Sequence, residues 1–201
     1  MTFLKADQVE VFEQEGFLGA QWEPDADAEP PNPTVIDKLP ASAFPTASRL
    51  YIYSSKAYAI GKKLASKMPA VRDIELHETI EADTVGVLEA VGGGGGPVRC
   101  EVRHMRGVSE EGLRWGDKAG ELPSIERLHV CVEVPEDLGD GDAAGEFGVS
   151  CVSSLLKIRG IEELKFRLEP PAAFDSFERL VEERTHGHTI EGLPGRFGTI
   201  G

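Results

Sequence analysis

The sequence has few basic residues and no long apolar run. Lys and Arg number 21 against 35 Asp and Glu, so the formal net charge is -14. Nucleic acids and anionic membranes favour basic surfaces, and this charge argues against both as main partners. No apolar stretch approaches the roughly 20 residues that a membrane-spanning helix needs. The composition therefore predicts no nucleic-acid partner and no membrane partner.

Cysteine is also scarce, and a signal peptide is lacking. The chain has Cys100, Cys131 and Cys151 at wide spacing, each in an apolar context and none in a CxxC motif. This usage favours buried, reduced thiols over a disulfide framework. The first residues carry acids and lack the basic and apolar regions of a secretory signal. We therefore expect a cytoplasmic or nuclear protein.

Composition divides the chain into four segments. Residues 1–21 include a polar and apolar pattern over residues 3–16 that predicts a short amphipathic helix. Residues 22–43 are acidic and rich in proline, which predicts a linker. Residues 44–184 carry a periodic pattern, and residues 185–201 are expected to form a flexible tail. The function should therefore reside in the periodic region.

The periodic region repeats a short apolar motif, L-x-x-L-x-L. Its middle residues are Leu50, Ile74, Leu128 and Leu164, and a fifth, poorer match places Val102 at the middle. These positions are separated by 24, 28, 26 and 36 residues. Each motif precedes apolar residues at helical spacing. The five predicted helices contain Ile60, Leu64 and Met68; Thr84, Val87, Leu88 and Val91; Leu113, Ala119 and Leu122; Val149, Val152, Leu155 and Leu156; and Phe174, Phe177, Leu180 and Val181.

Five alternations of strand and helix are compatible with two α/β architectures. A doubly wound sheet covers both faces with helices, so its central strands are apolar throughout. Here each strand has one polar face, for example Glu75 and His77 beside Ile74 and Leu76. The pattern therefore favours a single-sheet parallel solenoid of about five repeats with helices on one face. The doubly wound sandwich remains the alternative.

The strand motif followed by a helix resembles the leucine-rich repeats of the ribonuclease-inhibitor-like kind, over roughly residues 44–183. The phrases FPTASRLYIY, MPAVRDIEL and LPSIERLHV are also similar to degenerate repeats of fungal F-box-type proteins, although no F-box is recognisable. The family's usual Asn or Cys, five positions after the middle residue, is absent in all five units. The resemblance implies a solenoid of irregular repeats whose concave strand surface binds other proteins.

Motifs for catalysis, cofactors or metals find little support. Gly92–Gly96 follow a predicted helix and precede a strand, the reverse of a phosphate-binding loop, so a connector is favoured. His186 and His188 have no cysteine or carboxylate near them in the tail. His77 and His129 lie two strands apart, about 9.6 Å, which is too far to share one zinc ion. We expect no cofactor, no metal and no enzymatic activity.

The polar faces of the predicted strands supply the candidate binding residues. Aromatic and Arg side chains on a preformed surface are typical of binding hot spots. We therefore predict a protein-binding module that uses this surface; the alternatives are a substrate-recruiting adaptor of a larger complex and a small α/β enzyme with its site at strand ends, near Glu78, Arg106 and Glu133. The predicted binding residues are Tyr51, Tyr53, Glu75, His77, Arg103, Met105, His129, Lys165 and Arg167.

Overall fold

The computed structural model describes most of the chain. The described residues are 7–14, 17–21, 36–91, 96–139 and 141–187. The expected linker therefore lies largely outside them, as do most of the glycine run and the tail from residue 188 onward.

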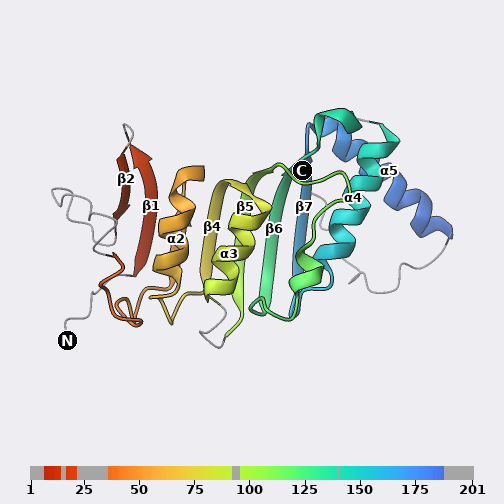
Figure 1. Cartoon of the computed structure of the whole chain (residues 1–201). Coiled ribbons are helices and arrows are strands. Elements are labelled where there is room, and N and C mark those ends of the chain that lie inside the picture. The colour runs from red at the N-terminus through yellow and green to blue at the C-terminus, as the bar shows by residue number, and fades with distance from the viewer. Residues whose placement is uncertain (1–6, 15–16, 22–35, 92–95, 140, 188–201) are drawn as a thin grey trace.

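Seven strands form one sheet in the order β2-β1-β3-β4-β5-β6-β7 (Figure 1). The strands are β1 (Gln8–Gln14), β2 (Phe17–Gln21), β3 (Arg49–Ile52), β4 (Asp73–Ile80), β5 (Val98–Arg106), β6 (Ile125–Glu133) and β7 (Glu163–Glu169). β1 and β3 to β7 are parallel, and β2 pairs with β1 in the antiparallel sense. The five predicted repeat strands thus lie side by side in chain order.

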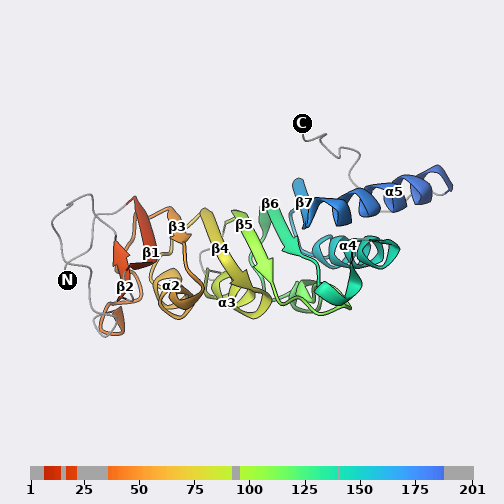
Figure 2. The same cartoon turned by 90° about the horizontal axis from the view of Figure 1, so that it is seen from above.

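The helices that connect these strands lie on one face of the sheet. They are α2 (Tyr58–Ala65), α3 (Glu81–Val91), α4 (Asp142–Leu155) and α5 (Pro171–Gly187), with short 3-10 turns η1 (Ser55–Ala57), η3 (Trp115–Lys118) and η4 (Glu136–Leu138). Figure 2 shows α2, α3 and α4 on the same side, with α5 beside α4 at the β7 end. No described helix covers the other face. The single-sheet prediction is confirmed, and the doubly wound alternative is wrong.

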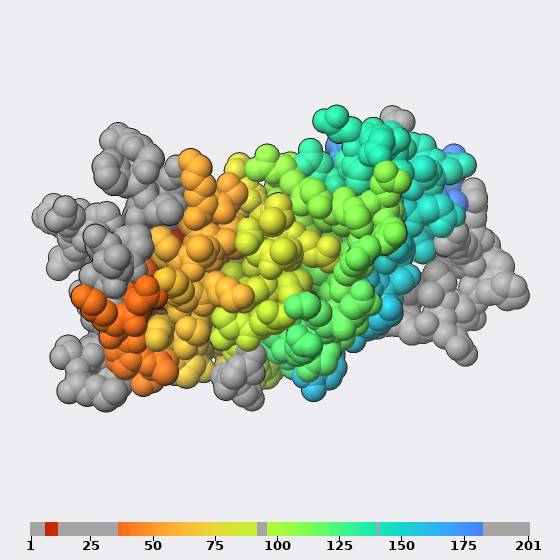
Figure 3. All heavy atoms as spheres, in the orientation of Figure 1, coloured from red at the N-terminus to blue at the C-terminus, as the bar shows by residue number. Residues whose placement is uncertain are grey.

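The core fills the space between the sheet and these helices. Alternate strand residues such as Leu50, Leu76 and Leu128 are buried, because side chains on a strand alternate between its two faces. The helices bury predicted residues such as Leu64 and Leu88 against them. On the helical side, successive units pack in chain order without a break (Figure 3). The apolar packing that joins successive units therefore lies on this side of the sheet.

The prediction for the N-terminal segment was wrong. Instead of a helix over residues 3–16, Gln8–Gln14 form β1, which pairs with β3. Val9 and Val11 are fully buried, which is the period of two expected for a strand. The linker boundary also needs correction, since Ile36, inside the predicted linker, is fully buried in the core. β1 thus extends the parallel sheet by one strand.

The third repeat also differs from the prediction. Ile74 on β4 and Leu128 on β6 both pair with Cys100, so the middle position is Cys100 and not Val102. The helix expected over residues 113–122 is replaced by the 3-10 turn η3. Trp115 is fully buried there, between the predicted core residues Leu113 and Leu122. One large side chain therefore fills the space that a helix fills in the other units.

Among the residues that the structure describes, no helix combines the length and apolar character needed to cross a bilayer.

Candidate binding surface on the open face of the sheet

The face of the sheet turned away from the helices is called the open face here. Its side chains form four rows that cross the strands. Pairing between strands sets the register of these rows. Row one holds Gln8, Arg49, Asp73, Arg99, Arg127 and Glu163; row two holds Glu10, Tyr51, Glu75, Glu101, His129 and Lys165; row three holds Tyr53, His77, Arg103, Cys131 and Arg167; row four holds His104, Glu133 and Glu169.

Eight of the nine predicted binding residues lie on this face and are partly or fully exposed. The ninth, Met105, is fully buried, and its assignment to the surface was wrong. From the pair Val102–Val130 to the pair Met105–Val132, β5 advances by three residues and β6 by only two. This extra residue is a β-bulge, and it reverses the facing of every residue that follows. Met105 consequently points into the core.

The bulge places His104 on the open face, whereas an unbroken period of two from Arg103 would turn it inward. His104 adopts the left-handed conformation, with φ of 65°, which is uncommon for a residue other than glycine. Glu78, on the neighbouring strand β4, has φ of 46° and is likewise skipped in the pairing of β4 with β5. Two adjacent strands therefore carry matching bulges near their carboxyl ends.

An aromatic group occupies the β3 and β4 part of the open face. The rings of Tyr51 and Tyr53 stack with centroids 6.1 Å apart, and the Tyr53 ring lies 5.0 Å from the His77 ring. Burial, with the nearby carboxylates of Glu10 and Glu75, raises the pKa of Tyr53. Tyr53 is nevertheless 41% exposed. It is an aromatic side chain already fixed in place and open to a partner.

Ion pairs connect the strands across the first three rows. Arg99 contacts Asp73 at 2.7 Å. Arg103 contacts Glu101 at 2.7 Å and Glu75 at 3.2 Å. Each pair is partly exposed and contributes no more than about 1 kcal/mol to stability. Their larger effect is to fix the long side chains in defined positions.

A second set of ion pairs converges on Glu163, on β7. Its carboxylate lies 2.9 Å from Lys165, 3.3 Å from His129 and 3.5 Å from Arg127. The hydrogen bond from Lys165, with that from His129, lowers the pKa of Glu163. Glu163 thus stays ionised and orders the basic side chains of β6 and β7.

The open face is close to electrically neutral in a strongly acidic chain. Its four rows hold six Lys or Arg and seven Asp or Glu, a net charge of -1 out of -14 for the whole chain. Rows one and two enclose a shallow hollow of about 370 Å³, lined by Arg49, Tyr51, Asp73, Ile74, Glu75, Arg99, Cys100, Glu101, Arg127 and His129. The acidic excess therefore lies elsewhere on the molecule.

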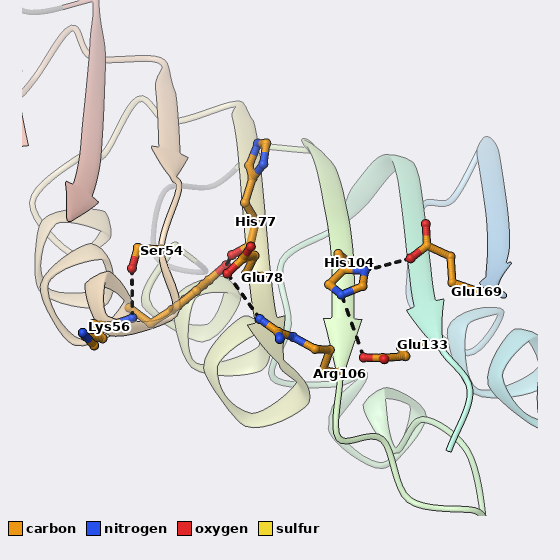
Figure 4. A network of polar contacts seen from close by, with 9 residues as sticks. Ser54, Lys56, His77, Glu78, His104, Arg106, Glu133 and Glu169 are labelled. Atoms are coloured by element: carbon orange, nitrogen blue, oxygen red, sulfur yellow. Dashed lines mark hydrogen bonds and ion pairs between the residues drawn. The ribbon is translucent and has the colours of Figure 1, made fainter. Parts of the chain in front are cut away.

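Row four forms a separate cluster at the carboxyl ends of β5, β6 and β7 (Figure 4). His104 Nδ1 lies 2.8 Å from Glu169 Oε2, and its Nε2 lies 3.9 Å from Glu133 Oε2. Burial raises the pKa of Glu169, but hydrogen bonds from His104 and Cys131 outweigh this and lower it overall. Burial, then the bond to Glu169, raises the pKa of Cys131 to about 11.

These values limit the chemistry of the cluster. The Cys131 thiol is protonated at neutral pH, which disfavours nucleophilic catalysis, because the thiolate is the reactive form. The two His104 nitrogens face carboxylates on opposite sides of the ring, so the three groups do not converge on one point. Within the described ranges, no group of three His, Cys, Asp or Glu is placed to hold a metal ion. What the geometry leaves possible is proton transfer by His104.

The strand-end residues proposed for an enzyme site are not brought together as a set. Glu78 pairs with Arg106 at 3.2 Å, whereas Glu133 faces His104 (Figure 4). Sequence reasoning missed His104, Glu169 and row one. Applying the period of two to every strand would have found row one, but nothing in the sequence marked the bulge.

Comparison with protein-family models, with curated proteins and with solved structures finds no match.

Proposed function

We propose that this protein is a non-enzymatic binding module that engages a protein partner through the open face. One observation carries the proposal: five consecutive parallel strands display aromatic and charged side chains on a face that no described helix covers. Solenoid proteins commonly use such an extended strand surface for binding. Tyr and Arg, which dominate binding hot spots, both occur here in positions fixed by neighbours.

Two further expectations belong to this proposal. The middle positions Leu50, Ile74, Cys100, Leu128 and Leu164 align across the sheet, at intervals of 24, 26, 28 and 36 residues. These unit lengths support the resemblance to irregular leucine-rich repeats. All three cysteines of the chain are free thiols, which supports a cytoplasmic or nuclear location.

Affinity capture from the source cell tests the proposal. The bait is the wild-type chain, compared with a Tyr53→Ala/Arg103→Ala/Arg167→Ala variant of the open face. The matched control is Lys63→Ala/Arg114→Ala/Arg179→Ala, whose three exposed side chains belong to the helical side and its loops. We expect a partner that the open-face variant loses and the control retains. A wild-type partner list unchanged in the open-face variant would remove the proposal.

A second candidate function is favoured by the row-four cluster. Glu169 orients the His104 ring through Nδ1, an arrangement that suits a general base. Glu133 and Glu169 also line a hollow of about 540 Å³ beside Pro170. If the protein were an enzyme of this kind, His104→Gln would abolish turnover in a hydrolase substrate screen, while Tyr53→Ala would leave it intact. The adaptor alternative has less support, because β1 is part of the sheet and no N-terminal helix is described.

A further inference from the structure

Row three differs from the other rows in its charge. Row one contains Asp73 and Glu163, and rows two and four also contain carboxylates. Row three has none: Arg103 and Arg167 are basic, and the other members are Tyr53, His77 and Cys131. It is a band without carboxylates that runs from the end of β3 to β7, although Arg103 is paired with Glu75 and Glu101 of row two.

Both arginines of this band have donors to spare. Arg103 uses Nε for Glu101 and Nη2 for Glu75, which leaves Nη1 uncommitted, and its side chain is 54% exposed. Arg167 is exposed and has no carboxylate within 4 Å among the described residues, although its charge helps to lower the pKa of Glu169. An Arg guanidinium has five N–H donors arranged to match a carboxylate. Each arginine can therefore donate hydrogen bonds to a carboxylate of a partner.

The spacing along the band identifies the shape of that partner. Neighbouring strands lie about 4.8 Å apart, so Arg103 on β5 and Arg167 on β7 are about 9.6 Å apart. Tyr53 directly follows β3, two strand positions from β5, and so lies about the same distance on the other side of Arg103. A polyproline II helix rises about 3.1 Å per residue with three residues per turn, so every third residue faces the same side, about 9.3 Å apart. The two spacings agree.

We propose that row three binds an acidic, proline-containing peptide in the polyproline II conformation, with an apolar residue at Tyr53 and carboxylates three and six residues later at Arg103 and Arg167. This inference rests on the proposed function, because it names the partner of the same open face. Aromatic side chains commonly bind proline in this conformation. The Tyr51–Tyr53 stack and the His77 ring provide such a surface.

Labelled peptides test the proposal by fluorescence anisotropy. The probe is Pro-Pro-Ser-Glu-Pro-Ser-Glu-Pro-Ser, in which the glutamates are three residues apart. The control probe, Pro-Pro-Ser-Pro-Glu-Glu-Ser-Pro-Ser, has the same composition with adjacent glutamates. We expect the spaced probe to bind about two- to fivefold more tightly than the control, the difference expected for one exposed charge pair. Equal affinities would overturn the proposal.

Variants then locate the site. Arg167→Gln should weaken the spaced probe about two- to fivefold and remove its preference over the control probe. Arg179→Gln, an exposed arginine on α5, should change neither. Circular dichroism of each variant establishes that the fold is intact. An equal loss with Arg179→Gln, or displacement of the peptide by an oligothymidylate of equal charge, would contradict a peptide site on row three.

The outcome is separable from that of the proposed function. If capture of a natural partner depends on the open face but neither probe binds, only the inference about acidic peptides fails. If the open-face variant loses no partner, the proposed function fails, whatever the probes do.

Discussion

Glu169 contacts two side chains of the open face, His104 and Cys131. Its carboxylate accepts from His104 and from the Cys131 thiol, and all three come from different strands. The charge of Glu169 therefore affects how β7, the last strand of the sheet, packs against its neighbours. Two predictions at the residue scale follow from its hydrogen bonds.

The first concerns the reactivity of Cys131. Burial and Glu169 together raise the pKa of this thiol to about 11. Glu169→Gln removes the negative charge, so the pKa should fall and the thiolate fraction at pH 8.5 should rise. Alkylation by iodoacetamide, followed by mass spectrometry, should therefore be faster in this variant than in wild type. Glu163→Gln on the same strand serves as control, and a rate unchanged by Glu169→Gln would exclude the proposed hydrogen bond.

The second concerns stability against pH. The pKa of Glu169 is lowered in the folded state, so its contribution is present above the unfolded value, about 4.3, and is lost as pH falls through the folded value. At pH 6 the free energy of unfolding in urea should be larger for the wild type than for Glu169→Gln. This difference should be smaller at pH 3. Glu162→Gln, an exposed neighbour, is the control. A difference that grew toward low pH would contradict the shift.

At the scale of the elements, the matching bulges of β4 and β5 determine which side chains reach the open face. Glu78 is exposed and left-handed, a conformation that glycine adopts without cost and β-branched residues disfavour. Glu78→Val should lower the free energy of unfolding by about 1–3 kcal/mol, whereas Glu78→Gly should change it little. Arg49→Val, at an exposed and regular strand position, is the matched control. Equal effects of the two Glu78 variants would mean that this bulge is absent.

Helices α4 and α5 pack closely through a glycine. A Cβ added at Gly148 would lie 2.7 Å from the Phe177 ring and 2.9 Å from a methyl group of Leu168. Both side chains are buried, so neither can move away freely. Gly148→Ala should therefore destabilise the protein by about 1–3 kcal/mol in thermal or urea unfolding. Gly120→Ala, where nothing lies within 4 Å, provides the comparison, and an unchanged midpoint for Gly148→Ala would argue against this packing.

The elements that the sequence predicted are those with a strong period. In the segments Leu50–Ile52 and Ile74–Leu76, apolar and polar residues alternate, and the units recur at near-constant spacing. The order of the strands and the side on which the helices lie could therefore be predicted. β1 was missed because a short polar and apolar pattern fits either element, and the free edge of β3 decides between them. The bulge at His104 leaves no trace in composition, which is why Met105 was placed on the wrong face.

At the scale of the whole molecule, the charge distribution separates two surfaces. The four rows of the open face carry a net charge of -1, whereas the whole chain carries -14, so the acidic excess lies outside these rows. The antiparallel strand β2 ends the sheet on one side, and α5 packs on α4 at the other. The five repeat strands thus have a further element at each end, β1 and β2 at one end and α5 at the other.

The central claim is that partners bind the open face, and capture with paired variants tests it most directly. Quantitative mass spectrometry should compare wild type, Tyr53→Ala/Arg103→Ala/Arg167→Ala and Lys63→Ala/Arg114→Ala/Arg179→Ala, each first shown to unfold cooperatively. The account predicts at least one protein that is retained by the wild type and the helical-side variant and lost by the open-face variant. A partner that the helical-side variant loses and the open-face variant keeps would contradict it.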